Sequence, residues 1–348
     1  MSKRKQDDAE NEIDNDDVSL VDVDFEFFDP NPDVDFIALK RLILQLFQSD
    51  AELFHPHQLA DLILSQPLIG STVKTDGRET DPYAFLTVLN MHVHQNNPSI
   101  KALIAHALLK SANNLPFHAA LQSLVGPAGL ESMNHVGFIF CERLINMPVQ
   151  VIPHMYRMLA DEVKWAIDDN EPYVFTHFLI FSRTYRLSPE EEAEMQAAAP
   201  QAKRHRSSAP TQSSAGGVFS FHHEDEYIQK FALHTLEYPF TGAQPREKDS
   251  FGLEQGGSMM LMPADKLPEL IARMSEAYAD RNKSVLVLDS CVYGSNSHEL
   301  GLSLIEADDK NQVEAAVGGR QGSVESARPA AVVDDIPDGG YGREIVAG

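Results

Sequence analysis

The sequence predicts an α/β fold in which a mixed central sheet is flanked by helices. Segments with apolar residues at helical spacing alternate along the chain with short segments rich in β-branched and aromatic residues. This interleaving is typical of a sheet covered by helices on both faces. The chain is 43% hydrophobic and 8% aromatic, which is sufficient for a packed core and excludes disorder over the whole length.

Composition divides the chain into three regions. Residues 1–20 combine many carboxylates with few apolar side chains, which predicts a disordered acidic N-terminus. Residues 21–282 are expected to form a single α/β domain, interrupted at 188–217 by a disordered loop rich in Ala, Ser, Pro and Glu. Residues 283–348 are expected to be a mostly disordered tail that contains one strand at 284–293.

The domain is expected to begin with a strand and a helix. Residues 21–27 alternate apolar side chains with acidic ones, which predicts a strand with one acidic face. Residues 33–47 carry apolar side chains at helical spacing, with Asp33 as the expected N-cap after Pro32. The elements that follow are a helix at 57–64, strands at 68–74 and 83–93 separated by an Asp76-Gly77 turn, helices at 98–110 and 116–124, and a buried strand at 135–141.

The second half of the domain continues the alternation. A long helix is predicted at 153–167, because Pro153 suits a first helical turn and apolar residues recur on one face after it. The remaining elements are strands at 173–181 and 218–221, a helix at 225–236, a strand at 258–262 and a helix at 264–278.

Acidic residues dominate the charge of the chain. It contains 52 Asp and Glu against 28 Lys and Arg, for a net charge of -24. This excess argues against direct binding of nucleic acid or of anionic membrane, and it favours a basic partner. Much of the excess lies toward the two ends of the chain, with -10 in residues 1–35 and -6 in residues 283–348.

An N-terminal acidic segment is therefore the candidate for masking a basic partner, the alternative being that it only keeps the protein soluble. Its residues are Asp7, Asp8, Glu10, Glu12, Asp14, Asp16 and Asp17.

The sequence favours a reducing compartment, in the cytosol or the nucleus. Its two cysteines, Cys141 and Cys291, cannot build a disulfide framework. The N-terminus has no apolar segment typical of a secretory signal, and no run reaches the roughly 20 apolar residues of a spanning helix. A basic cluster in the predicted loop is a candidate nuclear import signal, with Lys3 to Lys5 as a second one. It consists of Lys203, Arg204, His205 and Arg206.

Motifs for catalysis, cofactor binding or metal binding are not found. Neither a phosphate-binding glycine loop nor the Gly-x-Ser-x-Gly turn of hydrolases occurs in the chain. The closest histidine groupings are His55-x-His57, His92-x-His94 and His222-His223, and without accompanying ligand spacings we interpret them as structural. A buried hydrophobic role is favoured over a nucleophilic one for Cys141. We therefore predict no catalytic, cofactor-binding or metal-binding residue.

One junction between a buried strand and the long helix has two interpretations. It is formed by Glu142, Arg143, Leu144, Ile145, Asn146, Met147 and Pro148. In the first, favoured interpretation it is a structural turn, in which Arg143 pairs with a carboxylate, Asn146 supplies the turn and Pro148 stops the strand. In the second it is a junction that faces a ligand.

Several long segments resemble the BCCIP family, and its fungal branch most of all. They are residues 21–47, 66–77, 135–165 (which include the junction), 219–238 and 256–278, in the same order. The resemblance covers about Asp22 to Asn282, and the tail at 284–348 has no counterpart in it.

The resemblance implies an acetyltransferase-like (GNAT-type) fold that has lost its enzymology. Active acetyltransferases of this type hold acetyl-CoA with an Arg/Gln-x-x-Gly-x-Gly/Ala loop. Neither Gly126 nor Gly340, the two Gly-x-Gly/Ala positions, has Arg or Gln three residues earlier. We therefore expect a protein that is not an enzyme and has no cofactor.

The resemblance also implies a function in the nucleus and cytoplasm. It implies a chaperone for a basic ribosomal protein of the large subunit, with roles in ribosome biogenesis and nuclear export. The expected partners are that protein, the nuclear transport machinery and a phosphoinositide kinase, and the family is also linked to actin organisation and vesicular transport. The alternatives are an active GNAT-type acetyltransferase and a general export or trafficking adaptor without a ribosomal client.

Overall fold

The structure, a computed structural model, describes residues 23–66, 68–187, 217–242 and 254–279, together with two strands at 284–288 and 300–306. All of these elements belong to one compact unit of the chain. The predicted acidic N-terminus at 1–20 and, apart from Gly217, the predicted loop at 188–217 lie outside the described residues.

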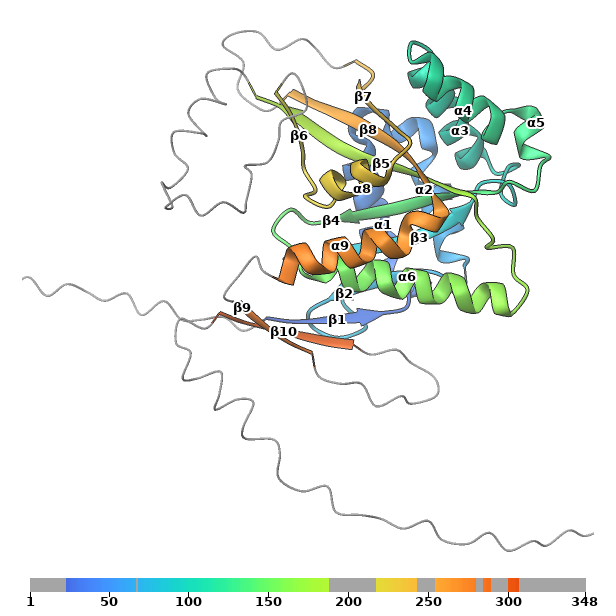
Figure 1. Ribbon diagram of the computed structural model, residues 1–348. Coiled ribbons are helices and arrows are strands. Elements are labelled where there is room, and N and C mark those ends of the chain that lie inside the picture. The colour runs from blue at the N-terminus through green and yellow to red at the C-terminus, as the bar shows by residue number, and fades with distance from the viewer. Residues whose placement is uncertain are drawn as a thin grey trace, which may run out of the picture. The chain divides into compact units, whose positions relative to one another are not determined.

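A ten-stranded mixed sheet organises the described residues (Figure 1). Its strands are β1 (Val23–Phe28), β2 (Ser71–Lys74), β3 (Ala84–Asn90), β4 (Val136–Arg143), β5 (His177–Arg186), β6 (Val218–Ser220), β7 (His234–Pro239), β8 (Glu254–Pro263), β9 (Ser284–Leu288) and β10 (Leu300–Glu306). Their order is β7-β8-β5-β4-β3-β2-β1-β10-β9, and β6 pairs with β5. Among the described pairs only β4 and β5 run parallel.

Helices cover both faces of this sheet, which confirms the predicted fold class. They are α1 (Pro32–Phe47), α2 (Pro56–Leu64), α3 (Pro98–Ser111), α4 (Leu115–Val125), α5 (Pro127–Leu130), α6 (Val151–Asp168), α8 (Asp225–Phe231) and α9 (Leu267–Ala279), with short 3-10 helices at Gln48–Phe54 and Ala264–Lys266. Proline stands in the first turn of α1 to α5, where a missing N–H costs no hydrogen bond. No helix in the described part is both long and apolar enough to span a membrane.

Two apolar clusters sandwich the central strands. Phe138 and Phe140 of β4 belong to the cluster built with α1 to α4, whereas Ile139 and Cys141 belong to the cluster built with α6 and α9. Successive side chains of a strand point to opposite faces, so β4 is buried on both sides. β4 is therefore a continuous apolar run as far as Cys141, as the sequence predicts for residues 135–141.

The first helix begins differently from the prediction. Asn31, not Asp33, is the N-cap, and its side chain accepts a hydrogen bond from the Asp33 N–H at 3.1 Å. Asp35 returns the interaction by accepting from the Asn31 N–H at 2.8 Å. The prediction of Asp33 is wrong because Pro32 takes the first helical position, which its fixed φ favours.

The predicted helix at 225–236 is wrong in its second half. α8 ends at Phe231, and the chain turns into β7, which pairs with β8. Tyr238 lies opposite Gly257, where a Cβ atom would come within 2.4 Å of the tyrosine ring. The glycine thus makes room for the ring, and pairing with a distant strand overrides the local helical pattern.

Several boundaries also differ from the prediction. β2 begins only at Ser71, because Gly70 has a φ of +133° that interrupts the strand. β5 begins at His177 rather than at residue 173. β9 lies within the strand expected at 284–293, whereas β10 falls in a segment for which no element was expected.

Candidate functional site

The parallel pair β4 and β5 is the natural place to look for a site. Ligands of α/β sheets bind at the carboxyl ends of parallel strands. The pairing of β4 with β5 runs from Val136↔His177 to Ile139↔Ile180 and goes no further. Beyond this point β4 stays paired with β3, and β5 stays paired with β8. Their carboxyl ends are therefore not paired with each other, and we call the region between them the β4–β5 crevice.

Charged side chains of the protein itself fill the β4–β5 crevice. Glu142 of β4 accepts hydrogen bonds at Oε1 from Arg183 Nη2 of β5, at 3.1 Å, and from Gln45 Nε2 of α1, at 2.7 Å. The same oxygen lies 2.9 Å from Nε2 of His222, which precedes α8. The side chains of Glu142, Arg183 and His222 are at most 4% exposed.

A second set of charges adjoins the first. Arg143 and Glu224 form a two-pronged ion pair, with Arg143 Nη2 donating to Glu224 Oε2 at 3.0 Å. Ser182 of β5 donates to the carboxylate of Asp225. All of these side chains are buried. Together, Glu142, Arg143, Arg183, His222, Glu224 and Asp225 form what we call the buried charge network.

The network sets the protonation of its own members. Burial raises the pKa of Glu142, but the adjacent His222 and Arg183 outweigh it and bring the pKa down to about 2. Burial lowers the pKa of His222, and Glu142 reverses this to a net increase. Burial raises the pKa of Asp225 to about 7, opposed by the charge of His222. Each cation thus has a carboxylate partner, as buried charges require.

The buried charge network joins segments that are distant in sequence. β4 contributes Glu142 and Arg143, β5 contributes Arg183, and the turn before α8 contributes His222 and Glu224. The guanidinium of Arg183 also lies over the Phe221 ring, 4.5 Å from its centre. The ion pairs and hydrogen bonds of this network therefore hold the β6–α8 segment against the ends of β4 and β5.

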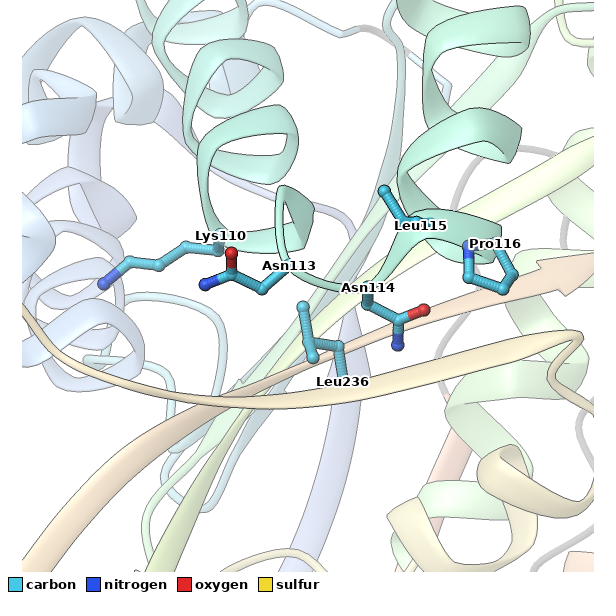
Figure 2. A pocket seen from close by; sticks show the side chains of 6 residues that line it. All are labelled: Lys110, Asn113, Asn114, Leu115, Pro116 and Leu236. Carbon is cyan, nitrogen blue, oxygen red and sulfur yellow. The ribbon is translucent and has the colours of Figure 1, made fainter.

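Two cavities of the described residues lie elsewhere. One, of about 530 Å³, lies between the α3–α4 turn and β7, and Figure 2 shows Leu236 of β7 pointing toward Asn113 there. Its other lining residues are Lys110, Asn114, Leu115 and Pro116. The second, of about 230 Å³, lies at the ends of β5, β7 and β8. Neither is lined by a member of the buried charge network.

The predicted junction at 142–148 divides into two parts. Glu142 and Arg143 join the buried charge network, and Met147 is buried, whereas Leu144, Ile145 and Asn146 are exposed. The Met147 N–H donates to the Leu144 carbonyl at 3.1 Å, which closes a turn around Asn146. β4 already ends at Arg143, so Pro148 does not stop the strand.

The other candidate residues from the sequence lie away from the buried charge network or outside the described residues. The import-signal residues Lys203 to Arg206 and the acidic segment from Asp7 to Asp17 lie outside the described residues. His92 and His94 follow β3 rather than belonging to it. Within the described part, no group of His, Cys, Asp and Glu has an arrangement that would hold a metal ion.

Cys141 is buried, and burial raises the pKa of its thiol well above the usual range, which opposes the thiolate form.

Sequence reasoning did not find Gln45, Arg183 or Glu224. One signal was present: Arg183 interrupts an apolar strand, and a charge inside such a strand needs a buried partner. The identity of that partner depends on which distant segment folds over the strand, and one strand's pattern contains no information about this.

Fold and site together define a class of protein. It is a mixed α/β domain in which paired charges of the protein itself fill the region between the carboxyl ends of its parallel strands.

Comparison with known proteins identifies the family. The model of the BCCIP family matches residues 20–228. "Protein bcp1" of Aspergillus oryzae is 43% identical over 267 residues, which cover 75% of this chain and 88% of that protein. "Protein bcp1" of Schizosaccharomyces pombe is 40% identical over 290 residues, covering 80% of this chain and 100% of that protein. The chain belongs to the BCCIP family, as its resemblance predicts.

A solved structure agrees with this assignment. The crystal structure of BCP1 from Saccharomyces cerevisiae superimposes with a TM-score of 0.52 at 25% identity and covers 78% of this chain and 96% of that one. About a fifth of this chain lies outside the matches to the Schizosaccharomyces pombe and Saccharomyces cerevisiae proteins, although their own lengths are covered almost completely.

Proposed function

We propose that this protein is a non-catalytic chaperone and transport adaptor for a basic ribosomal protein of the large subunit. It acts in ribosome biogenesis and nuclear export, and it works in the nucleus and the cytoplasm. The observation that carries the proposal is the filled β4–β5 crevice, because it leaves recognition to other parts of this acidic chain.

The filled crevice supports a role without catalysis. A catalytic site keeps at least one reactive group accessible to substrate, whereas Glu142, Arg143 and Arg183 are buried and bonded to one another or to their neighbours. Opening the crevice for a cofactor would separate buried ion pairs, and removing one partner of such a pair costs about 3–5 kcal/mol. Displacement of the β6–α8 segment is therefore costly.

The acidity of the chain supports a basic client. A ribosomal protein outside the ribosome exposes Lys and Arg patches that bind nucleic acid without specificity. A partner with a net charge of -24 attracts such patches and masks them. The acidic segment from Asp7 to Asp17 is the proposed masking element, and the basic cluster from Lys203 to Arg206 is the proposed import signal.

Affinity purification of the full chain, followed by mass spectrometry, tests the proposal. We expect a basic large-subunit ribosomal protein to be enriched at low salt and partly released at moderate salt, because screening weakens the attraction. Nuclear transport factors and a phosphoinositide kinase are expected at lower yield. Absence of any ribosomal protein at both salt concentrations contradicts the chaperone role and favours a general export or trafficking adaptor.

Calorimetry with acetyl-CoA tests the alternative of an active acetyltransferase. We expect no binding to the full chain, because the β4–β5 crevice is occupied by Glu142, Arg183 and His222. Micromolar binding, accompanied by acetylation of an added amine, contradicts the non-catalytic function.

A further inference from the structure

The side of β1 opposite β2 pairs with a strand from the far end of the chain. On one side β1 pairs with β2 only through Glu26, Phe27 and Phe28. On the other side Val23 to Phe27 pair with Leu304 to Leu300 of β10, antiparallel (Figure 1). The backbone groups of this edge are thus satisfied by a segment from the far end of the chain, and any extended segment has the same hydrogen-bonding groups.

The two faces of β1 differ in chemistry. Phe25 and Phe27 are buried in the apolar cluster with α6 and α9. Asp24 and Glu26 belong to the opposite face, where Asp24 is exposed and Glu26 is half-buried. Lys74 stands opposite Glu26 on β2, but its ammonium group is 2.6 Å from Asp35 and is buried there. Among the described residues no cation pairs with either carboxylate of β1.

The register partners of these carboxylates on β10 carry no charge. Asp24 lies opposite Ser303, and Glu26 lies opposite Gly301. Oppositely charged residues directly across a strand pair stabilise the pairing, and like charges destabilise it. A strand with Lys or Arg at alternate positions would therefore complement this edge better than β10 does. A second copy of β1 would place carboxylates near carboxylates, which disfavours self-association.

We propose that the outer edge of β1 binds an extended, basic segment of a partner by strand addition, and that the β9–β10 hairpin of this chain occupies the same edge in cis. The inference rests on the proposed function, since it assigns a docking site to the basic client. The hairpin is tethered to the domain, so it competes at a high effective concentration. The partner gains access when its charge pairs with Asp24 and Glu26 outweigh that advantage.

Two pairs of substitutions in the full chain separate the two halves of the proposal. Leu302→Pro with Ser303→Pro removes N–H donors from both edges of β10, and Leu302→Ala with Ser303→Ala is the matched control that keeps them. Asp24→Asn with Glu26→Gln removes the two charges with little change in shape. Asp168→Asn with Asp169→Asn removes two exposed carboxylates from the end of α6 and controls for net charge.

The probe is a labelled synthetic peptide in which lysine alternates with valine, compared with a peptide in which glutamate replaces lysine. We expect the proline pair to bind the lysine peptide at least about fivefold more tightly than the unmodified chain. Neutralising Asp24 and Glu26 should weaken binding about fivefold, and the α6 control should leave it unchanged. The glutamate peptide should not bind.

Hydrogen exchange locates the bound peptide. In the proline pair we expect faster exchange of the β1 amides than in the alanine control, and slow exchange again when the lysine peptide is added. The proposal is overturned if the peptide leaves β1 exchange unchanged, if it binds the Asp24/Glu26 variant as tightly as the unmodified chain, or if the glutamate peptide binds equally well. Thermal unfolding of each variant confirms that the domain is folded.

This outcome is independent of the test of the proposed function. If the purification recovers no ribosomal protein while the lysine peptide protects β1, the chaperone role fails and the strand-addition edge stands. If a ribosomal protein is recovered equally with the Asp24/Glu26 variant and the unmodified chain, the edge fails and the chaperone role stands.

Discussion

The β4–β5 crevice and the β1 edge use charge in opposite ways. In the crevice, Arg143 and Arg183 each have a carboxylate partner, and all the groups are buried. On the β1 edge, Asp24 and Glu26 have no cationic partner among the described residues, and Asp24 is exposed. Paired charges inside the domain bind the chain to itself, whereas Asp24 and Glu26 have no counter-charge among the described residues, and Glu26 accepts a hydrogen bond from the Gly77 N–H at 3.1 Å. The same residue types therefore hold the fold in one region and form the proposed docking site in the other.

The largest effect is expected inside the crevice. Glu142→Gln leaves Arg183 and His222 without their counter-charge, and we expect a loss of about 3–5 kcal/mol in the free energy of unfolding. Glu171→Gln, at an exposed position after α6, is the control and should change stability by less than about 0.5 kcal/mol. Denaturant unfolding measures both variants. A loss below about 1 kcal/mol for Glu142→Gln would show that the network is not stabilised as described.

A pH-dependent effect is expected at Glu162 of α6. This buried carboxyl accepts hydrogen bonds from the Gly70 N–H and the Ser71 hydroxyl, and burial raises its pKa from 4.5 to about 7. The folded state therefore holds a proton that the unfolded state releases, so stability falls as the pH rises from about 4.5 to about 7.

Glu162→Gln should remove this part of the pH dependence, at most about 3–4 kcal/mol. Unfolding measured at several pH values between about 4.5 and 7 checks it. Asp225 contributes a slope of the same sign, because burial raises its pKa as well. Glu142, with a pKa lowered to about 2, contributes the opposite slope only at pH values below about 4.5. An unchanged slope in the variant would contradict the role of Glu162.

Outside the domain, changes should act on partners and not on stability. Asparagine and glutamine in place of the seven carboxylates from Asp7 to Asp17 should leave unfolding within about 0.5 kcal/mol of the unmodified chain. They should weaken binding of the basic client and flatten its salt dependence, because fewer charges contribute to attraction. Binding measured at two or more salt concentrations checks this. Unchanged affinity and slope would leave the segment with a solubility role alone.

The smallest effect on the stability of the domain is expected at the basic cluster. Alanine in place of Lys203, Arg204 and Arg206 should not change the stability of the domain, and it should shift the protein from the nucleus toward the cytoplasm. Fluorescence microscopy of tagged chains measures the ratio. Alanine in place of Lys3, Arg4 and Lys5 is the matched comparison, and an unchanged distribution in the first variant together with a shift in the second would move the import signal to the N-terminus.

Much of the fold can be predicted from the sequence because it depends on local patterns of apolar and polar residues. Apolar spacing predicts α1, and period-two alternation predicts β1, which both form within a few residues of the expected bounds. β7 was missed because its residues continue a helical pattern, and only β8 supplies the hydrogen bonds that favour a strand. Likewise the sequence shows Glu142 and Arg143 as one junction, but their partners come from α1, β5 and the turn before α8.

By itself the sequence determined the fold class, the family and the uneven distribution of acidic charge, because composition, periodicity and long matching segments depend on order along the chain. Only the tertiary structure decided that the β4–β5 crevice is filled and that β10 lies on the edge of β1. Both depend on contacts between residues that are far apart in sequence. Burial makes such contacts strong, since a charge removed from water must find a partner and a strand edge must find hydrogen bonds.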